Sequence, residues 1–405
     1  MLRFRSLLLL LLAVFALTSQ SARGNEYPKV TPRPLLLAHY MPWFSAPPQS
    51  QNYGWHWTMN AFDPTQIING KRSIASHYYP LIGPYDSSEM AVVEYHLRTM
   101  KLAGIDGVIV DWYGRTDHFD YAQIHRNCEL VLQTAARLGL KFAVCYEDQT
   151  IPILVKGGKI RAEARVQHAA EEVRWLEENW FNNPAYLRLD GKPVWLSFGN
   201  DGLTGAEWEQ VLIGRAMPSL YLSEHRRRVG ADGAFDWPIP SQGLQATESF
   251  AARSHDWPVA MPVAFPRFHD IYGQAKVHDS YGIIPEDGGQ TLIHSLRNAL
   301  KSNPPLVQIA TWNDWGEGTQ IEPSDEPSEW HDLNTILRWR READPDFPFT
   351  EHDLGLPYRL LQLSRETDSP SYRAKIGAVA RALDAGDLAA ARAALRAIEH
   401  AELAK

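Results

Sequence analysis

Cysteine is scarce in this chain of 405 residues, in which only Cys128 and Cys145 occur. They form no paired spacing such as Cys-x-x-Cys, which argues against a structural zinc site. Cys128 falls in a helical pattern and Cys145 in a strand pattern. In an exported protein one disulfide between them and two separately buried thiols are equally open alternatives.

The sequence has no long block of lysine and arginine, and its formal net charge is -8. A protein that binds nucleic acid or an anionic membrane surface needs a basic stripe. We therefore expect neither partner. A neutral or weakly charged ligand suits this charge balance better.

An apolar run of membrane-spanning length is also missing. The apolar run at residues 7–17 is short, follows Arg3 and Arg5, and precedes small residues at 18–22. A basic start, a short apolar segment and small residues are typical of a secretory signal peptide. We expect residues 1–22 to be removed, leaving an exported protein, periplasmic or extracellular, with no stable membrane insertion.

Several catalytic motifs do not occur. There is no Gly-x-Ser-x-Gly elbow and no His-Glu-x-x-His, which argues against a serine hydrolase and against that zinc motif. Histidines in loops could still gather around a metal, as in a polysaccharide deacetylase. These are His39, His77, His269 and His278. Scattered loop histidines are usually ordinary polar residues, so we expect no metal and no cofactor.

Eight short apolar runs alternate with helical segments within residues 34–350. The expected strands are 35–40, 107–110, 141–146, 193–198, 220–222, 233–237, 258–264 and 306–310. Parallel strands that are buried on both faces appear as continuous apolar runs. The eight repeats predict an α/β fold, a (β/α)8 TIM barrel. A doubly wound open sheet is the alternative, but it would need a glycine-rich phosphate turn after the first strand, and none is present.

Helical patterns occupy the segments between the strands. The clearest are residues 87–102, 121–138, 163–180 and 291–300. Ser87 is the expected N-cap of the first helix and Gly104 its stop. Residues 355–405 predict a C-terminal helical extension, broken at residues 384–387, that packs on the barrel. The sharper alternative is a hairpin like one tetratricopeptide unit that docks a protein partner.

Polar and aromatic residues follow the expected strands, where an apolar core could have continued. In a (β/α)8 barrel the carboxyl ends of the strands form the functional face, so these residues should converge on one mouth. Aromatic rings stack on sugars, and the chain has 14 Trp and 16 Tyr. The candidate substrate-binding residues are His39, Tyr40, Trp43, Trp57, Asp111, Trp112, Tyr113, Glu147, Tyr281, Asn313 and Trp315.

Two carboxylates three residues apart, Asp314 and Glu317, follow the eighth strand. They belong to the run Thr-Trp-Asn-Asp-Trp-Gly-Glu-Gly-Thr-Gln-Ile-Glu at residues 311–322. Glycoside cleavage needs one carboxylic acid and a second, assisting carboxylate. Repulsion between close carboxylates raises one pKa, which keeps the acid protonated. The structural alternative is that Asp314 caps a short helix while Glu317 pairs with a surface arginine.

The same run resembles the Asn-Glu-Trp-x-Glu-Gly-Thr-Gln-Ile-Glu signature of glycoside hydrolase family 99, the endo-α-mannosidases and endo-α-mannanases. Its Trp-Asn-Asp-x-Gly-Glu part also resembles family 71, the α-1,3-glucanases. The segment from Asp86 to Tyr113 and the strand end at Tyr146 and Glu147 resemble the same group. The likeness extends over most of residues 34–340.

The resemblance implies a barrel that cleaves an α-linked glycan without a metal. Glu317 would act as acid and base, Asp314 would draw a proton from the 2-hydroxyl of the substrate, and Glu147 would lie near the reacting sugar. Asp314 is one methylene shorter than the family 99 glutamate, and Gly316 replaces a bulkier residue, both in the direction of family 71. Retention and inversion therefore both stay open.

We expect an exported, endo-acting glycoside hydrolase of α-mannan or α-glucan type, with a polysaccharide or oligosaccharide as its partner. The alternative is a catalytically silent glycan-binding barrel that works in envelope polysaccharide assembly. The two differ in where Asp314 and Glu317 point. An enzyme needs both in a cavity, whereas burial in the core or an ion pair with arginine would favour the silent barrel.

Overall fold

The computed structural model describes residue 27 and residues 32–199, 202–325, 330–366 and 369–403. The predicted signal peptide at residues 1–22 lies outside these ranges. Within them, no helix has the length and apolar character needed to cross a membrane.

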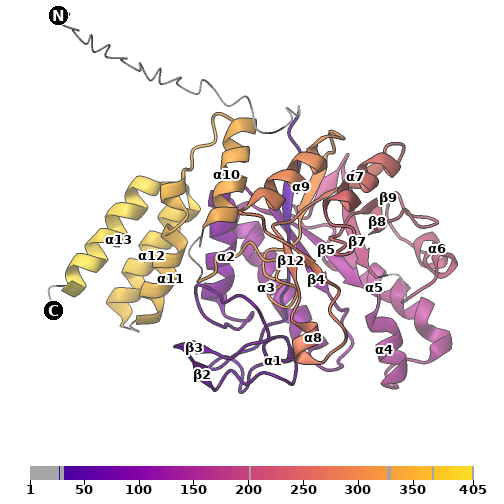
Figure 1. The fold of residues 1–405 in the computed structure, drawn as a ribbon, viewed down its shortest axis with the longest axis horizontal. Coiled ribbons are helices and arrows are strands. Elements are labelled where there is room, and N and C mark those ends of the chain that lie inside the picture. Colours follow the sequence, from indigo (N-terminus) through magenta and orange to yellow (C-terminus); the bar gives the residue numbers. More distant parts are fainter. Residues whose placement is uncertain (1–26, 28–31, 200–201, 326–329, 367–368, 404–405) are drawn as a thin grey trace, which may run out of the picture.

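The centre of the molecule is a barrel of parallel strands (Figure 1). In order these are β10 (Val259–Met261), β9 (Gly233–Phe235), β8 (Leu220–Glu224), β7 (Lys192–Phe198), β5 (Lys141–Glu147), β4 (Gly107–Trp112), β1 (Leu35–Tyr40), β14 (Leu306–Ile309) and β11 (Val263–Ala264). The short β6 (Arg188–Leu189) pairs antiparallel with β7.

One proline divides the seventh predicted strand into β10 and β11. β10 pairs with β9 and β11 pairs with β14, so this single stretch joins the two ends of the strand order. Pro262 separates the halves because it has no backbone N–H to contribute to a ladder. Its carbonyl still accepts a hydrogen bond from the Gln308 amide at 3.0 Å. The predicted (β/α)8 barrel is thus confirmed.

Side chains of each barrel strand alternate between two buried layers, because successive residues of a strand face opposite sides. On β1, Leu36, Ala38 and Tyr40 pack with the helices outside the barrel. Leu37 belongs to the inner layer, and His39 reaches the cavity at the end of the barrel. This alternation decides which strand-end residues can meet a ligand.

Helices cover the outside of the barrel. They are α2 (Met90–Ala103), α3 (Tyr121–Leu138), α4 (Thr150–Lys156), α5 (Arg165–Asn179), α6 (Gly205–Ile213), α7 (Leu244–Arg253), α9 (Gln290–Leu300) and α10 (His331–Ala343), with 3-10 turns η1 (Ala162–Ala164) and η2 (Glu351–Asp353). Gly104 ends α2 at a φ of 88°, as predicted. The predicted Ser87 cap is wrong, because α2 begins at Met90 and the Ser87 hydroxyl accepts a hydrogen bond from the Phe44 amide at 3.1 Å.

Short elements from the long loops gather at one end of the barrel, where Figure 1 shows α1, β2, β3 and α8 together. The loop elements are α1 (Trp55–Thr58), β2 (Ile67–Ile68), β3 (Lys71–Arg72), β12 (Phe268–His269), α8 (Tyr272–Ala275) and β13 (Ile283–Ile284). The amides of His269 and Ile271 donate to the carbonyls of Glu317 and Gly316 at 2.8 and 2.9 Å. The loop after β11 therefore braces the loop that contains the predicted catalytic pair.

Three further helices, α11 (Leu356–Glu366), α12 (Pro370–Asp384) and α13 (Leu388–Leu403), lie together on one side of the barrel (Figure 1). Arg98 on α2 donates to the Asp384 carboxylate at 2.7 and 3.2 Å, and Arg137 on α3 donates to it at 2.6 Å. The C-terminal helices therefore pack on α2 and α3. The predicted break between the last two helices falls at residues 385–387.

Candidate active site

A cavity of about 260 Å³ opens at the carboxyl ends of the barrel strands. Its lining residues are His39, Met41, Trp43, Asp111, Tyr113, Tyr121, Glu147, Gln149, Thr150, Ile153, Phe198, Trp237, Tyr272, Asp314 and Glu317. Those predicted from the sequence are His39, Trp43, Asp111, Tyr113, Glu147, Asp314 and Glu317. The structure thus brings the carboxylates from three strand ends into one cavity.

Asp314 and Glu317 share a tight turn after β14. The Asp314 amide donates to the Thr311 hydroxyl at 2.8 Å, and the Asp314 Oδ1 atom accepts from the Glu317 amide at 2.9 Å. Asp314 therefore caps its own turn, which is half of the structural alternative. The other half is absent, since among the described residues neither carboxyl forms an ion pair with lysine or arginine. Both side chains face the cavity.

The two carboxyls have unequal surroundings. Burial raises the pKa of Asp314 to about 6, and hydrogen bonds from the amides of Glu317 and Gly316 oppose this rise. Burial, with the nearby Asp314 as the next cause, holds the pKa of Glu317 well above its usual range. Glu317 Oε2 is buried without a hydrogen-bond partner in the described structure. In this cavity the charged form is therefore more favourable for the Asp314 carboxyl than for the Glu317 carboxyl.

Asp111 and Glu147 add two more buried carboxyls to the same cavity. Burial raises the pKa of Asp111, helped by Asp314, and burial raises the pKa of Glu147, helped by Asp111. One oxygen of each, Asp111 Oδ1 and Glu147 Oε1, is buried with no partner among the described residues. Buried polar atoms are nearly always hydrogen-bonded, so these oxygens can accept hydrogen bonds from a ligand. Sugar hydroxyls would satisfy them.

His39 supplies a neutral polar group. Its Nδ1 lies 3.4 Å from Gln308 Oε1, and its ring meets the Trp237 indole edge-on at 4.9 Å. Burial lowers the pKa of His39 to about 4, so the imidazole is uncharged at neutral pH. A neutral imidazole offers one donor and one acceptor to a ligand.

The predicted alternative of a histidine metal centre has no counterpart in the described residues. His77 stacks on His269 at 3.7 Å, and the His278 ring lies 4.6 Å from that of Tyr272. The residues that could approach one ion are instead His39, Asp111 and Cys145, whose ligand atoms lie within 4.8 Å of one another.

Both cysteines are free, and they lie on opposite faces of the barrel wall. Cys128 belongs to the layer between strands and helices, whereas Cys145 belongs to the inner layer. Of the two alternatives left open by the sequence, the separately buried thiols are the ones that the structure contains.

Several predicted substrate-binding residues are core residues. Trp112 follows Asp111 on β4 and therefore faces outward, where its indole donates to His125 at 3.1 Å and packs against Trp180. Tyr40 likewise follows His39 and faces α2. Neither lines the cavity, because the strand alternation turns it away.

The aromatic and amide groups of two loops are also buried away from the cavity. The Trp57 indole donates to the Tyr85 carbonyl at 2.8 Å, and its side chain is fully buried. Asn313 and Trp315 flank Asp314 but point into a polar network behind the site. Tyr281 lies at the opposite extreme, since it is 59% exposed and packs against Tyr272.

Other cavity residues were missed by the sequence analysis. Phe198 ends β7 and Trp237 closely follows β9. Both are aromatic residues at the carboxyl end of a strand, which is the criterion by which the other candidates were predicted. Trp237 also forms a hydrogen bond with Glu317. Tyr272 comes from the loop helix α8, whose position no sequence pattern indicated.

A second cavity, of about 600 Å³, adjoins the first and shares Tyr113, Tyr121 and Ile153 with it. Its other lining residues are Ser45, Gly54, Trp55, His56, Asn60, Phe119 and Asp120. The Phe119 side chain is 78% exposed, and the His56 ring stacks on Trp43 at 4.1 Å. The aromatic surface of the first cavity therefore continues into the second.

Comparison with known proteins gives a consistent result. Residues 33–230 match the model of glycosyl hydrolase family 99. A glycoprotein endo-alpha-1,2-mannosidase-like protein of Danio rerio is 23% identical over 325 residues, covering 70% of this chain and 69% of the relative. The glycoprotein endo-alpha-1,2-mannosidase of Mus musculus is 21% identical over 327 residues, covering 71% and 67%. These matches support assignment to glycosyl hydrolase family 99.

Solved structures agree with the family 99 fold. The GH99 endo-alpha-mannosidase of Bacteroides thetaiotaomicron has a TM-score of 0.59 at 17% identity, covering 76% of this chain and 98% of that one. A glycoside hydrolase-like protein gives a TM-score of 0.51 at 14% identity, covering 76% and 94%. The segment matched by the family 99 model contains Asp111 and Glu147. Asp314 and Glu317 lie beyond it.

Proposed function

We propose that this chain is an endo-acting glycoside hydrolase of α-mannosyl glycans, in which Glu317 is the acid and base and Asp314 the assisting base. The relatives named as endo-alpha-1,2-mannosidases support the reaction class, and they favour mannan over glucan among the predicted substrates. Family 99 assignment supports the same choice.

The observation that carries the proposal is that two carboxyls with unequal hydrogen bonding, Asp314 and Glu317, line one cavity. The pKa of Asp314 is raised only to about 6, because backbone amides stabilise its charged form against burial. The pKa of Glu317 is held well above its usual range by burial and by Asp314. Asp314 is therefore the carboxyl better suited to accept a proton, and Glu317 the one better suited to hold a proton for the leaving oxygen.

The proposed steps follow from the resemblance to family 99. Glu317 donates its proton to the glycosidic oxygen as the bond to the anomeric carbon breaks. Asp314 accepts the proton of the 2-hydroxyl, whose oxygen bonds to that carbon. Water then opens the resulting ring after losing a proton to Glu317, and Asp314 returns its proton to the 2-oxygen.

The remaining polar groups of the cavity support a sugar ligand. Asp111 and Glu147 each have a buried oxygen without a partner, and His39 is neutral. We assign these groups to hydroxyls of the sugar at the reacting position. Trp43 and Tyr113 provide rings at the same cavity, as platforms for sugar faces.

Endo action is supported by the second cavity. Cleavage inside a chain requires contact with several sugars, and the two cavities share Tyr113, Tyr121 and Ile153 along one aromatic surface. Export is supported by the signal-like residues 1–22. We also propose that the reaction needs no metal, since the carboxyl pair supplies both proton transfers.

A substrate panel tests the proposal. The purified protein is incubated with α-mannans and α-glucans of defined linkage, and new reducing ends and product sizes are measured with and without a chelator. We expect oligosaccharides, not only single sugars, from a mannan that contains α-1,2 linkages, at the same rate with chelator. A folded protein that releases no reducing ends from any α-mannan would contradict the proposal.

The silent glycan-binding barrel has one observation in its favour. Asp314 Oδ1 accepts a hydrogen bond from the Glu317 amide, which is the capping role expected of a structural residue. Affinity electrophoresis in mannan-containing gels, run beside the hydrolysis panel, separates the two functions. Retardation by mannan without release of reducing ends would favour the silent barrel.

A further inference from the structure

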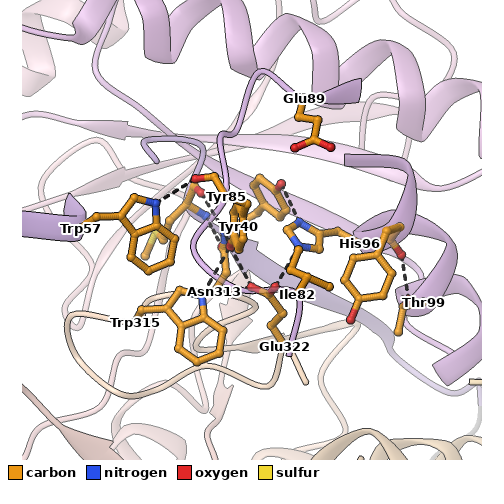
Figure 2. A network of polar contacts seen from close by, with 12 residues as sticks. Tyr40, Trp57, Ile82, Tyr85, Glu89, His96, Thr99, Asn313, Trp315 and Glu322 are labelled. Atoms are coloured by element: carbon orange, nitrogen blue, oxygen red, sulfur yellow. Dashed lines mark hydrogen bonds and ion pairs between the residues drawn. The ribbon is translucent and has the colours of Figure 1, made fainter. Parts of the chain in front are cut away.

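A buried polar network joins the loop 311–322 to β1 and α2 (Figure 2). Its centre is Glu322, five residues after Glu317 and at the end of the same motif. The side chains of Glu322 and of His96 on α2 are both fully buried. Neither residue lines the cavity, so neither can contact a ligand there.

Both oxygens of the Glu322 carboxylate have partners. Oε1 lies 3.0 Å from His96 Nε2, and Oε2 accepts from the Tyr85 hydroxyl at 2.8 Å and from the Trp315 indole at 3.1 Å. On the far side of His96, Nδ1 lies 3.0 Å from the Tyr40 hydroxyl. A buried carboxyl with partners on both oxygens is held in one orientation by them.

The direction of these hydrogen bonds follows from the two phenols. Burial raises the pKa of Tyr40 and of Tyr85 well above the usual range, and Glu322 adds to both shifts. Both hydroxyls therefore keep their protons and can donate. Tyr40 can therefore donate to His96 Nδ1, an arrangement in which His96 Nε2 donates to Glu322.

The network reaches both neighbours of Asp314. Trp315 is held directly by Glu322, and Asn313 Nδ2 donates to the Tyr85 hydroxyl at 3.0 Å. The Asn313 side chain also makes two hydrogen bonds with the backbone of Met41, at 2.7 and 2.9 Å. Asp314 is thus fixed between two anchored residues.

The backbone closes the same loop at its base. The Glu322 amide donates to the Trp312 carbonyl at 2.8 Å, and the Trp312 amide donates to the His39 carbonyl at 2.6 Å. Because Asp314 in turn accepts from the Glu317 amide, the anchored segment includes both reacting carboxyls.

We propose that Glu322, oriented by His96, is the positioning residue for the reacting pair, acting through Trp315 and through Tyr85 and Asn313. The inference rests on the proposed function of Asp314 and Glu317 and extends it to a residue outside the cavity. Reacting groups need to be held within a fraction of an ångström, so a loosened loop lowers turnover more than binding.

Three substitutions form a graded test. Glu322→Ala removes the carboxylate that contacts His96 and Tyr85, and it leaves the Trp315 indole only its longer bond to the Tyr85 hydroxyl at 3.4 Å. Glu322→Gln keeps an oxygen for Tyr85 and Trp315, and its amide can face His96 if the imidazole moves its proton to Nδ1. The matched control is Glu177→Ala on α5, since Glu177 is also a buried carboxylate and accepts from the amides of Ala216 and Met217.

For mannan hydrolysis we expect Glu322→Ala to lower kcat by about 10- to 100-fold, the usual effect of removing an outer-shell partner. Glycan affinity, measured in a Glu317→Gln background, should change by less than about 3-fold, since the cavity lining stays intact. Glu322→Gln should recover most of the lost kcat. Glu177→Ala should lower the melting temperature without lowering kcat at a temperature where it is folded.

A second readout does not depend on catalysis. In protein labelled with ¹⁵N-tryptophan, the Trp315 indole signal is assigned by its loss in Trp315→Phe. We expect Glu322→Ala to shift this signal and Glu177→Ala to leave it in place. If wild type cleaves no glycan while the signal shifts, the proposed function fails and the anchoring contact stands.

Two results would overturn the inference. One is an unshifted Trp315 signal in folded Glu322→Ala, which would mean that the carboxylate does not hold the loop. The other is a wild-type kcat in that variant, or an equal loss of kcat in Glu177→Ala, which would reduce Glu322 to a stability residue.

Discussion

Asp314 and Glu317 are neighbours in one turn, yet their carboxyls differ in hydrogen bonding. Asp314 takes two backbone amides, whereas Glu317 has one buried oxygen with no partner in the described structure. Backbone donors favour the charged form and burial favours the neutral form. This difference supports the proposed roles of Asp314 as the base and Glu317 as the acid.

The pH dependence of kcat/KM should report the protonation of Asp314 and of Glu317. Asp314 has to be charged, so activity should rise with pH through about 6. Glu317 has to be protonated, so activity should fall at higher pH as this carboxyl loses its proton. The measurement uses a soluble mannan oligosaccharide. Activity that is highest near pH 4 and falls steadily through pH 6 would contradict the assignment.

The residues that line the cavity were predictable where the strand pattern was followed to the end of each strand. His39, Asp111 and Glu147 were found because each is a polar residue in the last two positions of a strand, facing inward. Tyr40 and Trp112 were placed in the site as well, although each follows an inward-facing residue and has to face the helices. The alternation was present in the sequence and could have separated the two groups.

At the scale of elements, the strands were predictable because they are continuous apolar runs, and β1 has the predicted bounds of residues 35–40. The start of α2 at Met90 was not predictable from the sequence. Ser87 could either cap this helix or accept a hydrogen bond from the Phe44 amide, and a tertiary contact decides between the two. The break at Pro262 was not predicted either, because the barrel can close across it only once both neighbouring strands are in position.

Closure of the barrel depends on a glycine in β9. A Cβ atom built on Gly233 would lie 1.7 Å from the Val259 carbonyl oxygen of β10. Gly233→Ala should therefore lower the free energy of unfolding by about 3 kcal/mol, as overpacking at rigid backbone does.

Chemical denaturation of this variant has a matched control in Gly205→Ala. A Cβ at Gly205, the first residue of α6, meets nothing within 4 Å. Its replacement should leave stability unchanged or raise it by up to about 1 kcal/mol. Equal stabilities of the two variants would show that β9 and β10 are not packed as closely as described.

At the scale of the whole molecule, the cavity concentrates buried carboxyls whose pKa values are raised: Asp111, Glu147, Asp314 and Glu317. A pKa that is higher in the folded than in the unfolded state contributes stability below the unfolded value, and this stability is lost as pH rises through the folded value. For Asp314 that window runs from its usual 3.8 to about 6.

Thermal unfolding should therefore show a lower melting temperature at pH 8 than at pH 6. Glu147→Gln, which cannot ionise, should raise the melting temperature at pH 8 by about 2 °C or more while lowering turnover. The exposed Glu178→Gln on α5 removes the same charge and should do neither. A melting temperature that increases from pH 6 to pH 8 in wild type, with no gain in Glu147→Gln, would contradict the raised pKa values.

We propose that Glu317 supplies the proton for cleavage of an α-mannosyl bond. The most direct test of this proposal measures mannan hydrolysis and mannan binding in parallel for wild type and Glu317→Gln. We expect the variant to lose at least about 1000-fold in kcat while its glycan affinity stays within about 3-fold of wild type. A folded Glu317→Gln variant that hydrolyses mannan at a rate close to that of wild type would contradict the account.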